Sequence, residues 1–268
     1  MYKLIAMNKQ IDIKELIDWY IMAGVVETCG DEPCLLIEEN NIAQQVNLQI
    51  NKKAVITNTS KPDNLVSLAL KNAKEKCQKA QTLGELKDIL INFEGCNLKS
   101  TANSTILGEG NEKAKVMLIG EAPGADEDRI GKPFVGRCGK LLDKMLEAIN
   151  LKREECYITN ILPWRPPGNR TPTDDELALC LPFLLRQIEL IEPSYILLLG
   201  KIAFKSVMDN PDSISRVRGK WFEYSLENGK KIDVLATFHP SYLLRSTAQK
   251  SKVWIDLLKL KGKMNKEN

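Results

Sequence analysis

Four short apolar runs alternate with amphipathic helical patterns through the second half of the chain. They cover residues 116–119, 156–159, 195–199 and 231–238. Strands that are apolar on both faces are typical of a parallel sheet, because helices cover such a sheet on both sides. The sequence therefore predicts an α/β fold over residues 85–262, with a doubly wound, mostly parallel central sheet flanked by helices.

The remaining residues form two flanking segments. Residues 1–84 carry a helical pattern at residues 12–23, then a stretch rich in Asn, Gln and Glu, and a second helical pattern from residue 63. These patterns predict a helical and loop N-terminal extension, to which the sequence assigns no role. Residues 263–268 are expected to form a basic tail.

Composition bears on location and on partners. No apolar run approaches the roughly 18 residues that a membrane span needs, and no signal-peptide pattern is present. Seven cysteines without disulfide-framework spacing suit a reducing compartment, so we expect a cytoplasmic protein without a membrane partner. We also expect a monomer. The formal net charge is only +3, but all nine arginines lie between Arg129 and Arg245. Positive charge suited to phosphate is thus confined to the predicted α/β domain.

Three polar loops follow three of the predicted strands. They begin at Gly120, Asn160 and His239, which is the only histidine of the chain. Because the carboxyl ends of parallel strands meet at one edge of the sheet, these loops are expected to line one crevice. The dinucleotide-binding glycine pattern, the phosphate-binding Walker loop and zinc-ligand spacing are all missing from the sequence. The sequence therefore predicts a polar crevice without a bound metal.

Five sequence blocks in and around these loops resemble the family 4 uracil-DNA glycosylases. In chain order they are Gly120–Asp128, Gly131–Gly136, Tyr157–Asn160, Arg165–Pro172 and His239–Arg245. The resemblance covers roughly residues 90–262. It implies a three-layer αβα uracil-DNA glycosylase-like domain that hydrolyses the N-glycosidic bond of uracil in DNA and leaves an abasic site. The implied partner is uracil-containing DNA.

The resemblance also implies roles for residues of the crevice. Glu127 matches a carboxylate that positions or deprotonates water, and His239 matches the donor to the uracil oxygen on which negative charge develops. Phe134 matches the ring that stacks on the flipped base, and Asn160 matches the amide that reads the uracil edge. The matched uracil-binding residues are Glu121, Ala122, Phe134 and Asn160.

Contacts to DNA are implied by the last two blocks. Leu243 matches the wedge that fills the space left by the flipped base. Phosphate contacts suit the polar and cationic side chains nearby. These are Arg165, Arg170, Ser241 and Arg245.

Several of these residues also have purely structural interpretations. Glu127 could be a carboxylate favoured at a helix N-terminus, and Phe134 could belong to the core. Leu243 and Leu244 could form one turn of a buried helix face. The occurrence of all five blocks in order favours the functional interpretation.

The cysteines of this chain depart from the family pattern. The resemblance implies a four-iron, four-sulfur cluster on four cysteines, but only Cys96 and Cys180 match that pattern. Phe93 and Trp164 stand at the other two positions. Two thiolates cannot hold such a cluster, so we expect no cofactor and no metal. The four side chains are instead expected to pack together and anchor the loop 165–171.

Two other functions compete with uracil excision. The first is a catalytically weak nucleic-acid-binding relative with a recognition or polymerase-associated role. The joint presence of Glu127, Asn160 and His239 disfavours it. The second is a metal-dependent phosphoesterase, which would need clusters of Asp and His that a chain with one histidine can hardly supply.

Overall fold

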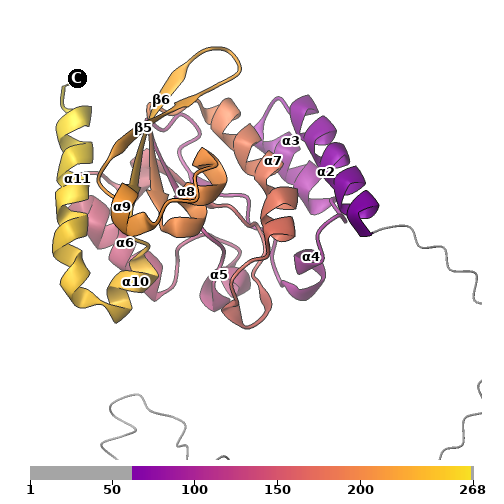
Figure 1. The fold of residues 1–268 in the computed structure, drawn as a ribbon, viewed down its shortest axis with the longest axis horizontal. Helices are drawn as coiled ribbons and strands as arrows, with labels where there is room; N and C mark the ends of the chain where they lie inside the picture. Colours follow the sequence, from indigo (N-terminus) through magenta and orange to yellow (C-terminus); the bar gives the residue numbers. More distant parts are fainter. Residues whose placement is uncertain (1–61, 267–268) are drawn as a thin grey trace, which may run out of the picture. The chain divides into compact units, whose positions relative to one another are not determined.

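A six-stranded sheet forms the centre of the protein, and its strands fan out between helices in the computed structural model, which describes residues 62–266 (Figure 1). The strand order is β1-β3-β2-β4-β6-β5. The four inner strands are parallel, and the edge strands β1 and β5 are antiparallel to their neighbours. The strands are β1 (Glu109–Gly110), β2 (Val116–Gly120), β3 (Cys156–Asn160), β4 (Tyr195–Leu199), β5 (Trp221–Ser225) and β6 (Lys231–Thr237).

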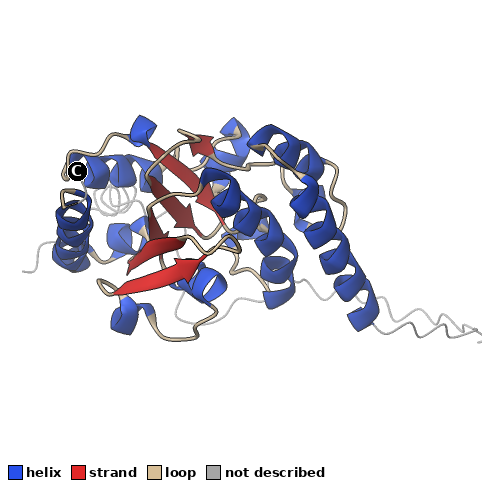
Figure 2. Cartoon of the chain, turned by 90° about the horizontal axis from the view of Figure 1, so that it is seen from above, coloured by secondary structure: helices blue, strands red, loops and turns tan. Residues whose placement is uncertain are grey.

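This sheet confirms the predicted doubly wound, mostly parallel α/β fold. Helices cover both of its faces (Figure 2). The helices are α2 (Pro62–Lys79), α3 (Leu83–Ile91), α4 (Leu98–Thr101), α5 (Ala125–Ile130), α6 (Arg137–Glu147), α7 (Asp174–Ile191), α8 (Lys201–Met208), α9 (Ile214–Val217), α10 (Pro240–Arg245) and α11 (Lys250–Met264). Strand β1 was not predicted, because a two-residue strand carries no periodic pattern.

Two buried clusters, one on each face of the sheet, make up the core. Successive strand residues point to opposite faces. Met117 and Ile119 of β2 therefore pack in the cluster that includes α2, α3, α7 and α8. Val116 and Leu118 pack in the cluster that includes α6, α10 and α11. The continuous apolar runs of the sequence are explained by burial on both faces.

The N-terminal side of this core includes α2. Ala73 is fully buried and Cys77 is 3% exposed, both in the cluster shared with α7. The domain core therefore begins ahead of the predicted boundary at residue 85. The predicted helix at residues 12–23 and the stretch that follows it, up to residue 61, lie outside the described residues.

At the C-terminal end, α11 continues into the segment expected to be a tail. Lys263 lies in its last turn and pairs with Asp233 at 2.5 Å. Within residues 62–266, the structure contains no helix with the length and apolar character that crossing a membrane requires.

Candidate active site

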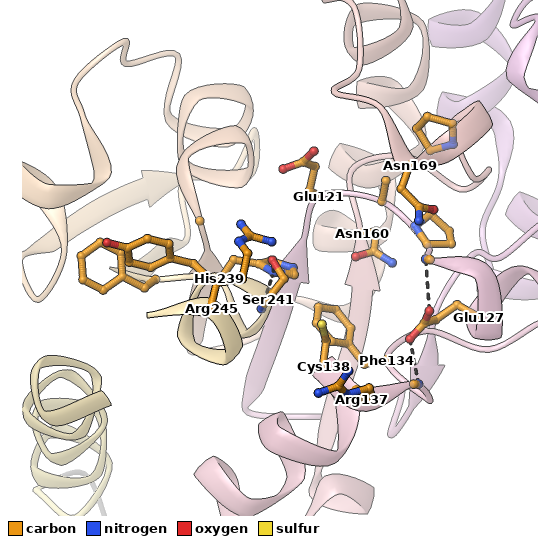
Figure 3. A pocket seen from close by; sticks show the side chains of 18 of the residues that line it. Glu121, Glu127, Phe134, Arg137, Cys138, Asn160, Asn169, His239, Ser241 and Arg245 are labelled. Atoms are coloured by element: carbon orange, nitrogen blue, oxygen red, sulfur yellow. Dashed lines mark hydrogen bonds between the residues drawn. The ribbon is translucent and has the colours of Figure 1, made fainter. Parts of the chain in front are cut away.

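The loops after β2, β3 and β6 line one cavity of about 730 Å³ at the carboxyl edge of the sheet. Gly200, at the end of β4, also contributes to its wall. Nine of the residues singled out in the sequence line this cavity: Glu121, Ala122, Glu127, Phe134, Asn160, Arg170, His239, Ser241 and Arg245. All of these except Ala122 and Arg170 are labelled in Figure 3. Arg165 and Leu243 do not line the cavity.

The wall beside Gly120 combines an amide with an aromatic ring. Gly120 pairs with Asn160 across the β2–β3 ladder. A Cβ atom on Gly120 would lie 2.4 Å from Oδ1 of Asn160 and 2.6 Å from Cζ of Phe134. Glycine is needed here because no real Cβ approaches other atoms so closely. The missing side chain lets the amide and the ring lie against the end of β2.

The Asn160 amide is poised to bind a ligand. Its side chain is 6% exposed, and Oδ1 has no hydrogen-bond partner among the described residues. A buried polar atom without a partner is costly, and it is usually satisfied by water or a ligand. Asn160 therefore presents an unused acceptor beside the Phe134 ring.

His239 faces the same ring. The His239 and Phe134 ring centroids are 5.7 Å apart. Nδ1 of His239 accepts a hydrogen bond from the backbone N–H of Ser241 at 3.1 Å and lies 2.8 Å from its Oγ. Burial and the positive charge of Arg245 lower the pKa of His239 to about 4. The imidazole is therefore neutral at pH 7, and Nε2 carries the proton it can donate.

The Glu127 carboxylate joins the start of α5 to the start of α6, both of which lie between β2 and β3. Oε1 accepts the backbone N–H of Val135 at 3.0 Å. Oε1 also accepts that of Gly136 at 2.9 Å, and Oε2 accepts that of Gly124 at 3.1 Å (Figure 3). The bond from Gly124 caps the start of α5, as the structural interpretation of Glu127 expected, and the bonds from Val135 and Gly136 lie at the start of α6. A carboxylate oxygen can accept two hydrogen bonds, so Oε2 retains the capacity to accept one from water.

The loop after β2 is also hydrogen-bonded to the loop after β3 through backbone groups. Ile161 and Leu162 donate N–H groups to the carbonyls of Gly120 and Glu121, each at 3.0 Å. The Glu121 carboxyl group lies at the cavity wall, where burial raises its pKa. The loops after β2 and β3 therefore hold one another in place.

Comparison with known proteins assigns this architecture. The family model of the uracil DNA glycosylase superfamily matches residues 107–258, more than half of the chain. The chain belongs to this superfamily. The match runs through all three loops that line the cavity.

Two curated type-4 uracil-DNA glycosylases are similar to this chain over most of their own length, and a DNA polymerase is similar over a small part of its length. A type-4 uracil-DNA glycosylase of Archaeoglobus fulgidus is 44% identical over 168 residues, which cover 61% of this chain and 84% of that protein. A type-4 enzyme of Thermotoga maritima is 43% identical over 175 residues, 64% of this chain and 89% of that protein. A DNA polymerase of Bacillus phage SP01 is 31% identical over 149 residues, 55% of this chain but 16% of the polymerase.

The cationic residues of this glycosylase-superfamily domain differ in how they are paired. Arg170 makes a bidentate ion pair with Glu176, at 2.6 and 2.9 Å. Nε of Arg165 donates to Oδ1 of Asn169 at 2.8 Å. Arg245 lines the cavity and forms no salt bridge with a carboxylate of residues 62–266. Arg245 is therefore the predicted arginine with the most freedom to meet a phosphate.

Sequence reasoning assigned no site role to other residues that line the cavity. The polar and cationic ones include Arg137, Asn169, Lys201 and Ser215. Arg137 directly follows the Gly131–Gly136 block, and this adjacency could have identified it. Lys201 and Ser215 follow no motif, because they reach the cavity only through the packing of α8 and α9.

Leu243 occupies a buried position in the glycosylase fold. It is 1% exposed and packs in the cluster that includes α6 and α11. The next residue, Leu244, is 36% exposed. Leu243 therefore belongs to a buried helix face, which was the structural alternative to its role as a wedge. Leu244 is the leucine of α10 that faces outward.

The positions of the implied iron–sulfur cluster are filled by packed aromatic rings. Phe93 stacks on Trp164 with ring centroids 6.5 Å apart and contacts Phe183 at 5.2 Å. Nε1 of Trp164 donates to Oγ1 of Thr105 at 2.9 Å, and Trp164 is 1% exposed.

Cys96 and Cys180 are the two cysteines beside these rings. Both thiols are buried in the same core cluster and are hydrogen-bonded to each other. The hydrogen bond with Cys96, together with burial, raises the pKa of Cys180 well above its usual value. Two thiols among large aromatic rings do not fit a four-iron, four-sulfur cluster, which needs four ligands and the volume that these rings occupy.

Proposed function

We propose that this protein hydrolyses the N-glycosidic bond of uracil in DNA and leaves an abasic site. The observation that carries the proposal is the unpartnered Asn160 amide, which shares one cavity with Phe134 and His239. Membership of the uracil DNA glycosylase superfamily supports it, as do relatives named type-4 uracil-DNA glycosylase.

Base recognition follows from the chemistry of the amide. Uracil presents an N–H donor at N3 and a carbonyl acceptor at O4. Oδ1 of Asn160 accepts from the first and Nδ2 donates to the second. Cytosine presents an acceptor and a donor at the same two places, so it mismatches this amide at both. The Phe134 ring provides an apolar surface on which the flipped base stacks.

Bond cleavage needs stabilisation of the uracil that leaves. As the bond to the sugar lengthens, negative charge develops on the uracil oxygens. The Nε2–H group of neutral His239 donates a hydrogen bond to one of these oxygens. Because Nδ1 is already held by Ser241, the ring does not need to reorient during the reaction.

The attacking water is assigned to Glu127. The sugar becomes oxocarbenium-like, and water adds to the face opposite the departing base. Three backbone N–H groups hold the Glu127 carboxylate, so its remaining acceptor site on Oε2 has a defined direction. This geometry supports the role of orienting one water through a hydrogen bond.

DNA is held by the cationic residues around the cavity. Arg245 and Arg137 line it and are exposed, which supports contacts to phosphates on either side of the flipped nucleotide. Residues 62–266 supply every group named for this reaction, which supports action as a monomer on uracil-containing DNA. Seven cysteines without disulfide-framework spacing support the cytoplasm as its compartment.

We also propose that the domain works without the iron–sulfur cluster. Phe93 and Trp164 stand where two ligand cysteines are expected, and their rings stack on each other. A packed aromatic core is well suited to bracing the loop 165–171, the part that the cluster would otherwise support.

The test is excision from oligonucleotides with a single uracil, as single strand and as duplex, followed by alkali cleavage at the abasic site. Cleavage of both uracil substrates is expected, with none at matched cytosine or thymine. His239→Ala should reduce the rate by about 10² to 10³ and leave DNA binding nearly unchanged. Binding of uracil-DNA without excision by the wild-type protein would support the catalytically weak relative instead.

A further inference from the structure

The backbone of Phe134 adopts an unfavourable conformation. Its φ angle is 51°, in the left-handed region that residues other than glycine rarely occupy. Such conformations persist only where surrounding contacts hold them, and they cluster at functional sites. Phe134 provides the ring beside Asn160 and His239, so its backbone determines where the base-stacking surface lies.

One contact that holds this backbone comes from α6. A Cβ atom on Gly139 would lie 1.7 Å from the carbonyl oxygen of Phe134. The Phe134 peptide therefore lies directly against the helix. This close approach restricts movement toward α6 but leaves the opposite direction open.

The second contact comes from Arg153, which lies just before β3 and outside the cavity. Its guanidinium donates from Nη1 to the carbonyl oxygen of Phe134 at 3.1 Å and from Nη2 to that of Pro133 at 2.7 Å. The same group pairs with Asp143 at 2.9 Å and with Glu109 at 3.4 Å. The planar fork of arginine suits this arrangement, because it donates in several fixed directions at once.

We propose that Arg153 is a positioning residue for catalysis: its guanidinium clamps the carbonyls of Pro133 and Phe134 and so keeps the Phe134 ring in place under the flipped base. This inference rests on the proposed function and assigns Arg153 no contact with substrate. The carboxylates of Asp143 and Glu109 orient the clamp, and Lys132 holds Glu109 in turn at 2.6 Å.

The first experiment compares two arginine clamps in the full chain. Arg186 is the matched control, because it also donates two hydrogen bonds to one backbone carbonyl, that of Ala80, and pairs with one carboxylate. Its side chain is 19% exposed, against 22% for Arg153. Arg186→Met should lower the melting temperature but keep the rate of uracil excision.

Arg153→Lys retains the charge beside Asp143 and Glu109, so the variant should fold. It lacks the planar fork of arginine and therefore cannot clamp both carbonyls. A ring displaced by about 1 Å reduces kcat by about 10- to 100-fold. KM for single-stranded uracil-DNA should remain near the wild-type value, because Arg153 does not touch the DNA. Arg153→Met should show the same loss or a larger one. Wild-type kcat in Arg153→Lys would overturn the inference.

A double-mutant cycle with Phe134→Ala separates positioning from general stability. If Arg153 acts through the Phe134 ring, Arg153→Lys costs no further activity once that ring is gone. Two losses that multiply in the double variant would overturn the inference while leaving the proposed function intact. Absence of uracil excision by the wild-type protein would overturn the proposed function and this inference with it.

Discussion

The backbone N–H of Ser241 donates a hydrogen bond to Nδ1 of His239 at 3.1 Å. An amide N–H can only donate, so Nδ1 must be an acceptor and the ring proton resides on Nε2. Burial, followed by the charge of Arg245, lowers the pKa of His239 to about 4. One short-range hydrogen bond thus selects the tautomer that can donate to uracil.

The first prediction concerns the titration of His239. As the chain has one histidine, its imidazole signals can be followed by NMR without assignment. We expect a midpoint near pH 4 and the Nε2–H tautomer at pH 7. The rate of excision should show no inflection near pH 6.5. A midpoint near 6.5 would contradict the neutral donor.

This pKa also has a consequence for stability. The unfolded chain binds a proton near pH 6.5, whereas the folded chain does so only near pH 4. The His239 contribution is therefore complete above pH 6.5 and declines as the pH falls toward 4. His239→Gln should flatten this part of the curve of unfolding free energy against pH.

The second prediction concerns base choice. In Asn160→Asp the donor to uracil O4 is lost and a carboxylate oxygen faces it, so uracil excision should fall by about tenfold or more. Cytosine, which presents an amino donor there, should gain. Asn169→Asp is the control, since it adds the same charge elsewhere on the cavity wall. Equal effects of the two substitutions would remove Asn160 from base recognition.

The third prediction concerns the salt dependence of DNA binding. Arg245→Gln should reduce the slope of log affinity against log salt by about one, as expected for one lost phosphate contact. Arg170→Gln should change it less, because Glu176 already neutralises Arg170. An unchanged slope in Arg245→Gln would show that phosphates bind elsewhere.

The fourth prediction separates two adjacent leucines. Leu244 is exposed on α10 and can fill the space left by a flipped base. Leu244→Ala should therefore slow excision from duplex DNA and leave single-stranded DNA unaffected. Leu243→Ala should instead lower the free energy of unfolding by about 2–5 kcal/mol, because it empties a core position. A duplex-specific loss in a stable Leu243→Ala protein would restore the wedge role to Leu243.

The fifth prediction concerns the aromatic cluster. Trp164→Ala should lower the free energy of unfolding by about 3–5 kcal/mol, since the ring is buried beside Phe93 and hydrogen-bonded to Thr105. Trp254→Ala, at a tryptophan that is 42% exposed, should cost much less. Protein purified without oxygen should contain no stoichiometric iron. Four irons per chain would contradict the proposal.

Much of this protein could be predicted from local patterns. The strands β2, β3 and β4 are short runs in which every residue is buried, and β6 is buried from Val234 to its end, so burial on both faces explains their apolar sequences. Polar loops after such strands meet at one edge by the geometry of a parallel sheet. The crevice and the three loops that line it could therefore be predicted from these patterns, whereas the roles of Glu127, Phe134 and Asn160 came from the resemblance to a known family.

Some features were decided by packing between distant segments. The helical pattern of α2 predicts a helix, but only its contact with α7 places Ala73 and Cys77 in the domain core. Leu243 and Leu244 are identical in type and adjacent in sequence. Only the position of α10 against α6 and α11 buries one and exposes the other.

The sequence by itself determined the fold class, the three loops and the set of polar groups available to them, because each depends on neighbouring residues. The tertiary structure alone decided how those groups are held. Arg153 meets Phe134 across 19 residues, and the tautomer of His239 matters only because Asn160 and Phe134 share its cavity. Such contacts depend on three-dimensional packing, which leaves no periodic pattern in the chain.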